Sequence, residues 1–269
     1  MGGLIDIGVT AGLGIWIGVT FVWALSLFLE DASIMDPAWG FGFVAVAWYA
    51  QLAAGGAREP RDLILLGAVS LWGLRLGGYL TWRRWGEPED KRYRRWRHQA
   101  GPSWWWKSYF KVFLLQGFLM WVISAPLVAA AVTSATALNW LDAVAGILWL
   151  LGFATESLAD WQLARFKSDP ANRGELLTEG LWRYSRHPNY FGETLQWWAF
   201  YGFAVAAGAW YTVFSPLLMT FLILRVSGVP ILERDLSDAK PGYEDYARRT
   251  PAFVPWFPRE ISGHTGNQD

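Results

Sequence analysis

The stretch RYSRHPNYFGETLQWWAFYGFAVAAGAW, residues 183–210, decides the class of fold. Residues 183–193 carry arginines, a histidine and a glutamate, whereas residues 194–210 carry no charged side chain. An apolar run of this length approaches the roughly 20 residues that a helix needs to cross about 30 Å of hydrocarbon. Residues 188–208 therefore predict a transmembrane helix with a polar start that needs a separate explanation.

The composition of the whole chain supports a membrane protein. The chain has 269 residues, of which 53% are hydrophobic and 17% charged, and it contains 20 tryptophans. A soluble domain carries about 25% charged residues. The net charge is zero, so nothing favours a nucleic-acid partner. The absence of cysteine excludes disulfides, thiolate metal sites and cysteine nucleophiles, and with three histidines we predict no metal site.

Seven apolar segments predict an all-α, polytopic membrane protein with about seven transmembrane helices. They are residues 11–29, 38–54, 63–82, 110–132, 138–158, 188–208 and 212–229. The N-terminus lacks the basic region and cleavage site of a signal peptide, so we expect the first segment to be retained. With no linker or repeat in sight, we predict one domain over residues 1–260 and a polar tail over 261–269.

The lysines and arginines of the loops predict the orientation. Residues 83–107, 160–187 and the chain after residue 229 are basic, whereas residues 133–137 and 208–211 are short and uncharged. By the positive-inside rule, the N-terminus lies outside and the C-terminus in the cytoplasm. Tryptophans at positions 82, 85, 96 and 104–106 fit an aromatic belt at the headgroup level.

Polar residues at membrane depth are candidates for function, because charged groups there are costly. One helical face carries Trp72, Arg75 and Tyr79. This face either lines a cavity, or Arg75 pairs with a carboxylate on another helix and the pair only holds the bundle together. Asp36 either caps a helix that Pro37 opens or points into the bundle with Trp39.

The C-terminal third holds a larger polar cluster. Glu156, Asp160 and Lys167 share one helical face, and residues 186, 189 and 193 are spaced three and four apart on another. Pro188 is expected at the start of the second helix, and Gly192 permits close approach of a neighbour. Cations, an amide and a helix N-terminus together predict a site for a phosphorylated anion. The alternative is that arginines here only meet lipid headgroups, which suits Arg183, Arg248 and Arg249.

The chain has neither a GxGxxG dinucleotide fingerprint nor a GxxxxGK[ST] loop. A nucleotide would therefore bind within a helical bundle.

Three stretches resemble the C-terminal region of the steroid 5α-reductase superfamily. They are ESLADWQLARFK, LLTEGLWRYSRHPNYFGETLQWW and KPGYEDYARRTPAFVPWFP. SIMDPAWG and LWGLRLGGYLTWRRWGEPEDKRYRRWR resemble in particular its bacterial branch of unknown function, DUF1295, so the resemblance covers most of the chain. It implies a bacterial inner-membrane enzyme that binds NADPH and delivers hydride to a polarised C=C bond of a steroid-like or other hydrophobic lipid.

The resemblance also implies roles for individual residues. Asp160 and Lys167 match an aspartate and a basic residue that contact the cofactor, and Asn189 and Glu193 match the family's N-[FY]-x-G-[DE] pattern. Cations would hold the pyrophosphate and 2′-phosphate, and carboxylates the ribose or carboxamide. The expected cofactor-binding residues, which fall mostly within about residues 138–260, are Arg84, Asp160, Lys167, Trp182, Arg186, His187, Asn189, Tyr190, Arg225, Glu233, Arg234, Tyr243 and Tyr246.

The substrate end departs from the family pattern. Steroid 5α-reductases use a Gln-Glu pair and a tyrosine in early spans, where this chain has Asp36 with Trp39, and Trp72. We predict Asp36 and Tyr79 as the groups that polarise a carbonyl or donate a proton, with Glu193 beside the nicotinamide. To donate a proton, Asp36 needs a pKa raised by burial. Trp39, Trp72 and Arg75 are the predicted substrate contacts.

The RHPxYxG core also resembles isoprenylcysteine carboxyl methyltransferases and related phospholipid methyltransferases, which bind S-adenosylmethionine. ILERDL, residues 231–236, resembles a motif of that class. Asp160, Lys167 and the basic loop around Arg84 favour the dinucleotide. A lipid-binding homologue without turnover is a third possibility. The predicted partners are a hydrophobic substrate from the bilayer and membrane lipids.

Overall fold

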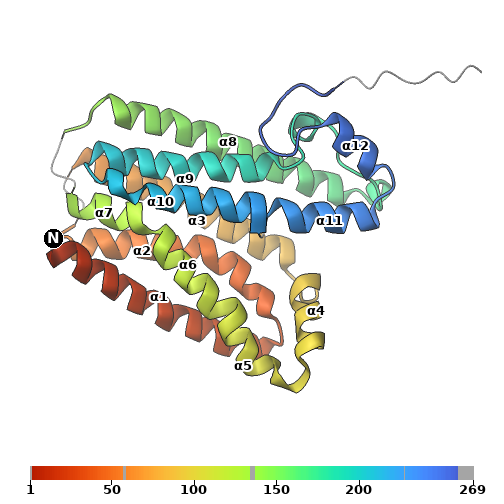
Figure 1. Ribbon diagram of the computed structural model, residues 1–269, viewed down its shortest axis with the longest axis horizontal. Helices are drawn as coiled ribbons and strands as arrows, with labels where there is room; N and C mark the ends of the chain where they lie inside the picture. Colours follow the sequence, from red (N-terminus) through yellow and green to blue (C-terminus); the bar gives the residue numbers. More distant parts are fainter. Residues whose placement is uncertain (1, 57–58, 134–136, 227, 260–269) are drawn as a thin grey trace, which may run out of the picture. The chain divides into compact units, whose positions relative to one another are not determined.

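The computed structural model describes residues 2–56, 59–133, 137–226 and 228–259, and these residues form helices and connecting segments without any β-strand (Figure 1). The chain divides into two compact units. Unit 1 comprises Met1–Gly146 and Trp198–Leu217, and unit 2 comprises Ile147–Trp197 and Leu218–Asp269. The prediction of one domain over residues 1–260 stays a prediction.

Unit 1 contains the N-terminal helices. These are α1 (Gly2–Leu29), α2 (Met35–Ala53), α3 (Pro60–Arg84), α4 (Lys91–Ala100), α5 (Trp104–Ser108), α6 (Leu115–Ile123) and α7 (Ala125–Thr133). A π-helical segment, Tyr109–Leu114, joins α5 to α6. Unit 2 contains most of α8 (Trp140–Ser168), the first half of α9 (Pro188–Ala206), the end of α10 (Phe214–Phe221), the π-helical segment Leu222–Val226, α11 (Val229–Ala239) and α12 (Tyr243–Arg249).

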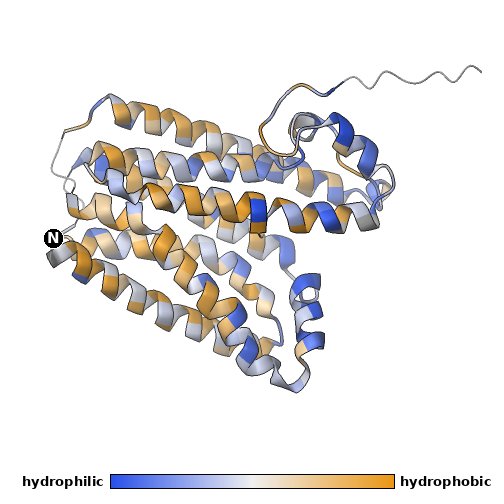
Figure 2. Ribbon diagram, viewed as in Figure 1, coloured by the Kyte–Doolittle hydropathy of each residue, from blue (hydrophilic) through white to orange (hydrophobic). Residues whose placement is uncertain are grey.

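Among the described residues, five helical segments are long and apolar enough to cross a membrane, and Figure 2 colours the ribbon by the hydropathy of each residue. They are Gly3–Leu29, Pro60–Arg84, Lys91–Thr133, Trp140–Ser168 and Trp210–Arg234. The predicted class of all-helical membrane protein is therefore confirmed. The predicted count of seven is not, because α2 and α9 form as helices but are not among these five segments. The predicted orientation stays a prediction.

Glycines allow α2 and α3 to pack closely within unit 1. A Cβ atom added to Gly40 would lie 2.4 Å from the carbonyl oxygen of Gly73, and one added to Gly73 would lie 2.5 Å from that of Gly40. Small residues permit this approach of two backbones, which is how helices gain packing energy within a bilayer. This contact fixes the start of α2, where Asp36 lies.

The start of α2 excludes one of the two interpretations of Asp36, the helix cap. The helix begins at Met35 after the N-cap Ile34, so Asp36 lies within the first turn and is not the N-cap. The preceding short helix Ala32–Ile34 uses Asp31 as its own cap, and it continues directly into α2. Asp31 thus does the capping that the sequence had suggested for Asp36, and the Asp36 carboxylate is left to make tertiary contacts.

A buried ion pair joins the starts of α3 and α8. The Arg61 guanidinium is fully buried and donates through Nε to Asp142 Oδ1 at 2.6 Å and through Nη2 to Asp142 Oδ2 at 2.7 Å. The backbone N–H of Asn139 donates to the same carboxylate at 2.8 Å. Removing one partner of such a pair leaves a buried charge uncompensated, at a typical cost of about 3–5 kcal/mol.

Candidate functional site

Unit 2 brings α8 and α9 into contact through two glycines. A Cβ atom added to Gly192 would lie 2.6 Å from both the backbone nitrogen of Glu156 and the carbonyl oxygen of Gly152. The expectation that Gly192 permits close approach is confirmed, as is a helix that starts at Pro188. The approach of the two backbones places the polar side chains of the two helices side by side.

Two amide–carboxylate pairs follow from this packing. Asn189 Nδ2 donates to Asp160 Oδ1 at 3.2 Å, and Gln196 Nε2 donates to Glu156 Oε2 at 2.6 Å. Asp160 and Glu156 are 4% and 2% exposed, and Gln196 is fully buried. Buried carboxylates of this kind are rare unless they are paired or functional, so the α8–α9 contact is the centre of a candidate site.

Glu233 of α11 is the centre of a second group of contacts. Its Oε1 atom accepts a hydrogen bond from Arg186 Nε at 2.8 Å, forms an ion pair with Arg186 Nη2 at 2.6 Å, and lies 3.3 Å from His187 Nε2. Arg186 Nη1 also donates to the carbonyls of Ala247 at 2.6 Å and Thr250 at 3.1 Å. Arg186 thus ties the start of α9 to α11 and to the end of α12. The predicted contact of Arg186 with a cofactor stays a prediction.

Aromatic residues surround this group. Trp182 Nε1 donates to the carbonyl of Ala159 at 3.2 Å, and Tyr246 OH donates to the carbonyl of Trp182. The rings of His187 and Tyr190 stack with centroids 5.7 Å apart. Burial raises the pKa of Tyr243 to about 12, and the carboxylate of Glu233 adds to that shift. The structure therefore brings predicted residues from the RHPNY stretch, α11 and α12 together.

The pKa of His187 is lowered from its ordinary value, mainly because burial disfavours the charged imidazolium. Glu233 acts in the opposite direction and does not overcome the effect of burial. His187 is accordingly neutral at physiological pH.

The remaining predicted cofactor residues of unit 2 have exposed or half-buried side chains. Lys167 in the last turn of α8, Arg225 in the π-helical segment and Arg234 of α11 are exposed, and Glu193 of α9 is half-buried. The side chains of unit 2 fit a phosphorylated dinucleotide in their chemistry: the Asp160–Asn189 pair suits hydroxyl or amide groups, and the exposed cations suit phosphates.

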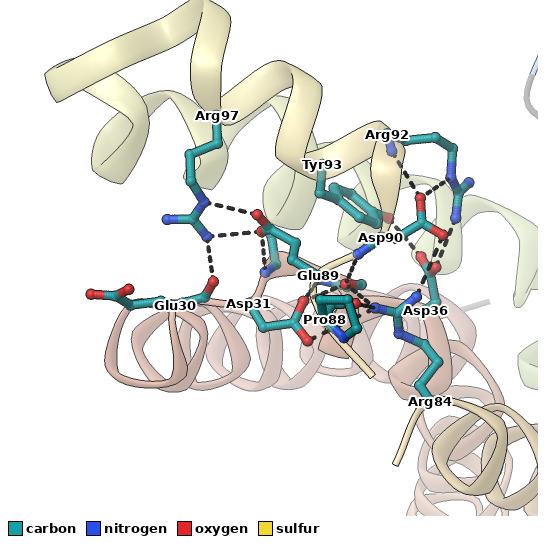
Figure 3. Close-up of polar contacts among 12 residues, drawn as sticks. Glu30, Asp31, Asp36, Arg84, Pro88, Glu89, Asp90, Arg92, Tyr93 and Arg97 are labelled. Atoms are coloured by element: carbon teal, nitrogen blue, oxygen red, sulfur yellow. Dashed lines mark hydrogen bonds and ion pairs between the residues drawn. The ribbon is translucent and has the colours of Figure 1, made fainter. Parts of the chain in front are cut away.

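A separate polar network surrounds Asp36 in unit 1 (Figure 3). The Asp36 carboxylate accepts from Arg92 Nη2 at 2.9 Å and from the hydroxyl of Tyr93 at 2.6 Å. Gln116 Nε2 donates to the Tyr93 hydroxyl at 3.3 Å, and Trp39 Nε1 donates to Gln116 Oε1. Asp36 lies outside the five apolar segments, and burial raises the pKa of its carboxyl against the opposing effects of Arg92 and Tyr93.

Arg84 belongs to the same end of unit 1 (Figure 3). Its guanidinium donates to Ser33 Oγ at 2.7 Å and to the carbonyl of Pro88 at 3.1 Å, and lies 3.4 Å from Asp90. These contacts fold the segment after α3 onto the start of α2. The predicted contact of Arg84 with a cofactor stays a prediction.

The other predicted substrate-end residues lie on α3. The buried Trp72 packs against Phe43 and Phe200 with ring centroids 5.9 and 5.7 Å away. The Tyr79 ring lies beside Arg83, with the guanidinium carbon 5.5 Å from the ring centroid. Arg75 is half-buried. The tyrosine that hydrogen-bonds to Asp36 is Tyr93.

Unit 1 also contains an apolar cavity of about 530 Å³ between α1 and α2. Its lining includes Ile15 and Val19 of α1, Met35 and Ala38 of α2, and Met120 of α6. Cavities of about 300–1,000 Å³ with mostly apolar walls are typical binding sites for small molecules. Met35 and Ala38 flank Asp36 in the sequence, so the cavity and the Asp36 network share the start of α2.

Sequence reasoning missed four residues of these networks: Arg92, Tyr93, Gln116 and Gln196. Gln116 and Gln196 had a usable signal, because each is a polar residue inside an apolar run, in FLLQGFLM and TLQWWAF. Arg92 and Tyr93 lie in the basic stretch 83–107, which served to predict the orientation, and nothing local to that stretch distinguishes them.

The fold and the two networks define an all-helical membrane protein with buried ionisable groups. The profile of the family described as "Protein of unknown function (DUF1295)" matches residues 22–250, and the chain belongs to that family. An uncharacterized protein of Schizosaccharomyces pombe is 27% identical over 270 residues, which cover 90% of this chain and 77% of the relative. No solved structure matches the chain.

Proposed function

We propose that this protein is a membrane-embedded, NADPH-dependent reductase of a hydrophobic substrate, and that it delivers hydride to a polarised C=C bond. The observation that carries the proposal is the Asn189–Asp160 hydrogen bond at the close α8–α9 contact. Replacing a buried ionised pair by an apolar pair is often neutral or stabilising, so a buried carboxylate in an apolar helical bundle favours a role in binding. The resemblance to steroid 5α-reductases supports the same assignment.

The residues of unit 2 have distinct roles in this proposal. When bound, NADPH supplies the hydride. Asp160 and Asn189 hold hydroxyl or amide groups of the cofactor, and the exposed cations Lys167 and Arg225 neutralise its phosphates. Arg186 is a positioning residue, because it holds Glu233 and the end of α12 in place. A site within apolar helices excludes water, which protects a hydride donor from side reactions.

The residues of unit 1 suit the substrate. The apolar cavity between α1 and α2 accepts a hydrophobic molecule. Asp36 has a raised pKa and hydrogen-bonds to Tyr93, so the pair is able to hold a proton at the Asp36 carboxyl or the Tyr93 hydroxyl. A reduction needs one proton for each hydride delivered, and this pair is the proposed source.

Equilibrium binding to detergent-solubilised protein tests the proposal. We expect NADPH to bind, and Asn189→Ala to weaken binding about 10–100-fold, as for a lost hydrogen bond to a charged or buried group. Gln99→Ala, which removes an exposed amide from α4, is the matched control and should leave the affinity unchanged. Failure of the wild-type protein to bind NADPH would contradict the proposal.

One observation favours a second candidate, an S-adenosylmethionine-dependent methyltransferase. Glu233, in the ILERDL stretch, is bonded to Arg186 and lies beside His187, so the two stretches that resemble methyltransferases meet in the structure. The same binding experiment distinguishes the two, because S-adenosylmethionine should bind and NADPH should not if this candidate is correct. Binding of neither ligand would favour a lipid-binding homologue without turnover.

A further inference from the structure

The segment Pro251–Arg259, here called the C-terminal segment, follows α12 without forming a helix, yet it is held firmly to unit 2. The carbonyl of Pro251 accepts from the backbone N–H of Arg186 at 2.9 Å, and that of Phe253 accepts from Ser185 Oγ at 2.7 Å. The backbone N–H of Trp256 donates to the carbonyl of Tyr184 at 2.9 Å. These three contacts fix the segment along residues 184–186.

The outward face of the C-terminal segment is strongly apolar. Val254 is 59% exposed, Trp256 70% and Phe257 72%, whereas Phe253 packs inward against Phe191 with ring centroids 5.7 Å apart. Figure 2 shows hydrophobic residues along this connection after α12. A held segment that presents large apolar side chains together indicates a surface that another apolar medium covers.

Exposed arginines lie at or beside both ends of the C-terminal segment. Thr250, which precedes the segment, donates through Oγ1 to the carbonyl of Arg183. Arg259, at the end of the segment, donates through its backbone N–H to the carbonyl of Arg249 at 2.9 Å. Each end of the segment therefore contacts the backbone of an arginine. The side chains of Arg183, Arg248, Arg249 and Arg259 are all exposed. Among these, Arg248 pairs with Asp245, and Glu244 is an exposed acid on the same helix. Within the part of the chain that the structure describes, these four arginines outnumber the two acids of α12, Glu244 and Asp245.

We propose that the C-terminal segment rests on the bilayer surface, with Val254, Trp256 and Phe257 at the boundary between headgroups and acyl chains and the arginines on anionic lipid headgroups. Tryptophan prefers this boundary, and clustered arginines are attracted to anionic lipids. Most of α8 belongs to unit 2, and α8 is long and apolar enough to cross a membrane, so a lipid surface is the apolar medium that this unit would meet. The segment thereby holds residues 184–186, next to His187 and Asn189, at the membrane surface.

The absence of cysteine makes a direct test possible. Single-cysteine variants Val254→Cys and Glu244→Cys are labelled with a fluorophore and reconstituted into vesicles of phosphatidylcholine and phosphatidylglycerol. Quenching is then measured with a lipid-borne nitroxide and with aqueous iodide. We expect the label at position 254 to be quenched several-fold more by the nitroxide and several-fold less by iodide than the label at position 244. Trp256 stays in place, so the segment keeps its main interfacial side chain.

Equal iodide quenching at both positions would overturn the proposal, and so would a label at position 254 that neither quencher reaches, because that result indicates a protein contact. A triple variant, R248Q/R249Q/R259Q, tests the lipid charge. Iodide protection at position 254 should be greater in anionic than in neutral vesicles for the parent protein, and this difference should disappear in the triple variant. A difference of the same size in both proteins would refute the arginine–headgroup contact.

Discussion

Lys167 is the single residue that best distinguishes NADPH from NADH in the proposed site. It is an exposed cation in the last turn of α8, and the 2′-phosphate is the only group that the two cofactors do not share. A charge-assisted hydrogen bond contributes about 1.5–3 kcal/mol, or about 10–100-fold in affinity. In a binding titration, Lys167→Ala should therefore weaken the affinity for NADPH by this factor and leave the affinity for NADH almost unchanged.

A matched control for this substitution lies on the same turn. Arg165 is an exposed cation whose guanidinium carbon lies 5.5 Å from the centroid of the Trp161 ring. Arg165→Ala removes the same charge and should preserve the preference for NADPH. An equal loss of NADPH and NADH affinity in Lys167→Ala would reject the assignment of this lysine to the 2′-phosphate.

His187 predicts how stability depends on pH. Its pKa in the folded protein is lowered by burial from an ordinary value of 6.5, so the unfolded chain binds more protons as the pH falls through that value. The stability that the neutral imidazole contributes is present above about pH 6.5 and is lost below it, by at most about 1.4 kcal/mol per pH unit. Glu233 and Arg186 are the charged groups that face the ring.

Thermal unfolding at about pH 7.5 and about pH 5.5 tests this linkage. The wild-type midpoint should fall on acidification by more than that of His187→Gln, which has no imidazole to protonate. The same decrease in both proteins would show that His187 is not the group responsible.

At the scale of elements, the close contact of α8 and α9 is what builds the candidate site. Gly192→Ala places a Cβ atom 2.6 Å from two backbone atoms, so the helices have to move apart. Overpacking of this kind typically costs about 1–3 kcal/mol. We expect a lower unfolding midpoint and weaker NADPH binding, since the Asn189–Asp160 pair spans the contact.

Gly146 offers the matched control on α8. Apart from its chain neighbours and the backbone of its own helix, a Cβ atom added there meets no described atom within 4 Å, so Gly146→Ala should leave stability unchanged or raise it by up to about 1 kcal/mol. If both alanine substitutions behave alike, the close approach at Gly192 has no special role.

Local signals predicted the helices better than their exact starts. Pro188 marks the start of α9, because proline at the first helical position needs no N–H donor. The uncharged residues 194–210 predicted that an apolar helix follows this start. Of the two interpretations of Asp36, the helix cap is wrong: an aspartate before a proline is a common cap, but the short helix capped by Asp31 lies directly before α2. The competing cap was visible only in the structure.

At the scale of the molecule, the sequence predicted the class of fold but not the number of apolar spans. Tryptophan, tyrosine and polar residues reduce the average hydropathy of α2 and α9, so the two helices form without joining the five apolar segments. The cluster in the C-terminal third was predicted from helical spacing on α8 and α9. The pairing of Arg186 with Glu233, and of Asp36 with Tyr93, depends on how distant elements fold together, and spacing within one helix carries no information about it.

The most direct test of the proposed activity is hydride transfer itself. The purified protein is incubated with a membrane lipid extract and NADPH that carries deuterium at the transferred position, and the lipids are analysed by mass spectrometry. The account predicts a lipid that gains one deuterium and one hydrogen, with NADPH consumed in equal amount, and loss of this product in Asn189→Ala. Lipids without deuterium in the presence of wild-type protein, together with methyl transfer from S-adenosylmethionine, would contradict it.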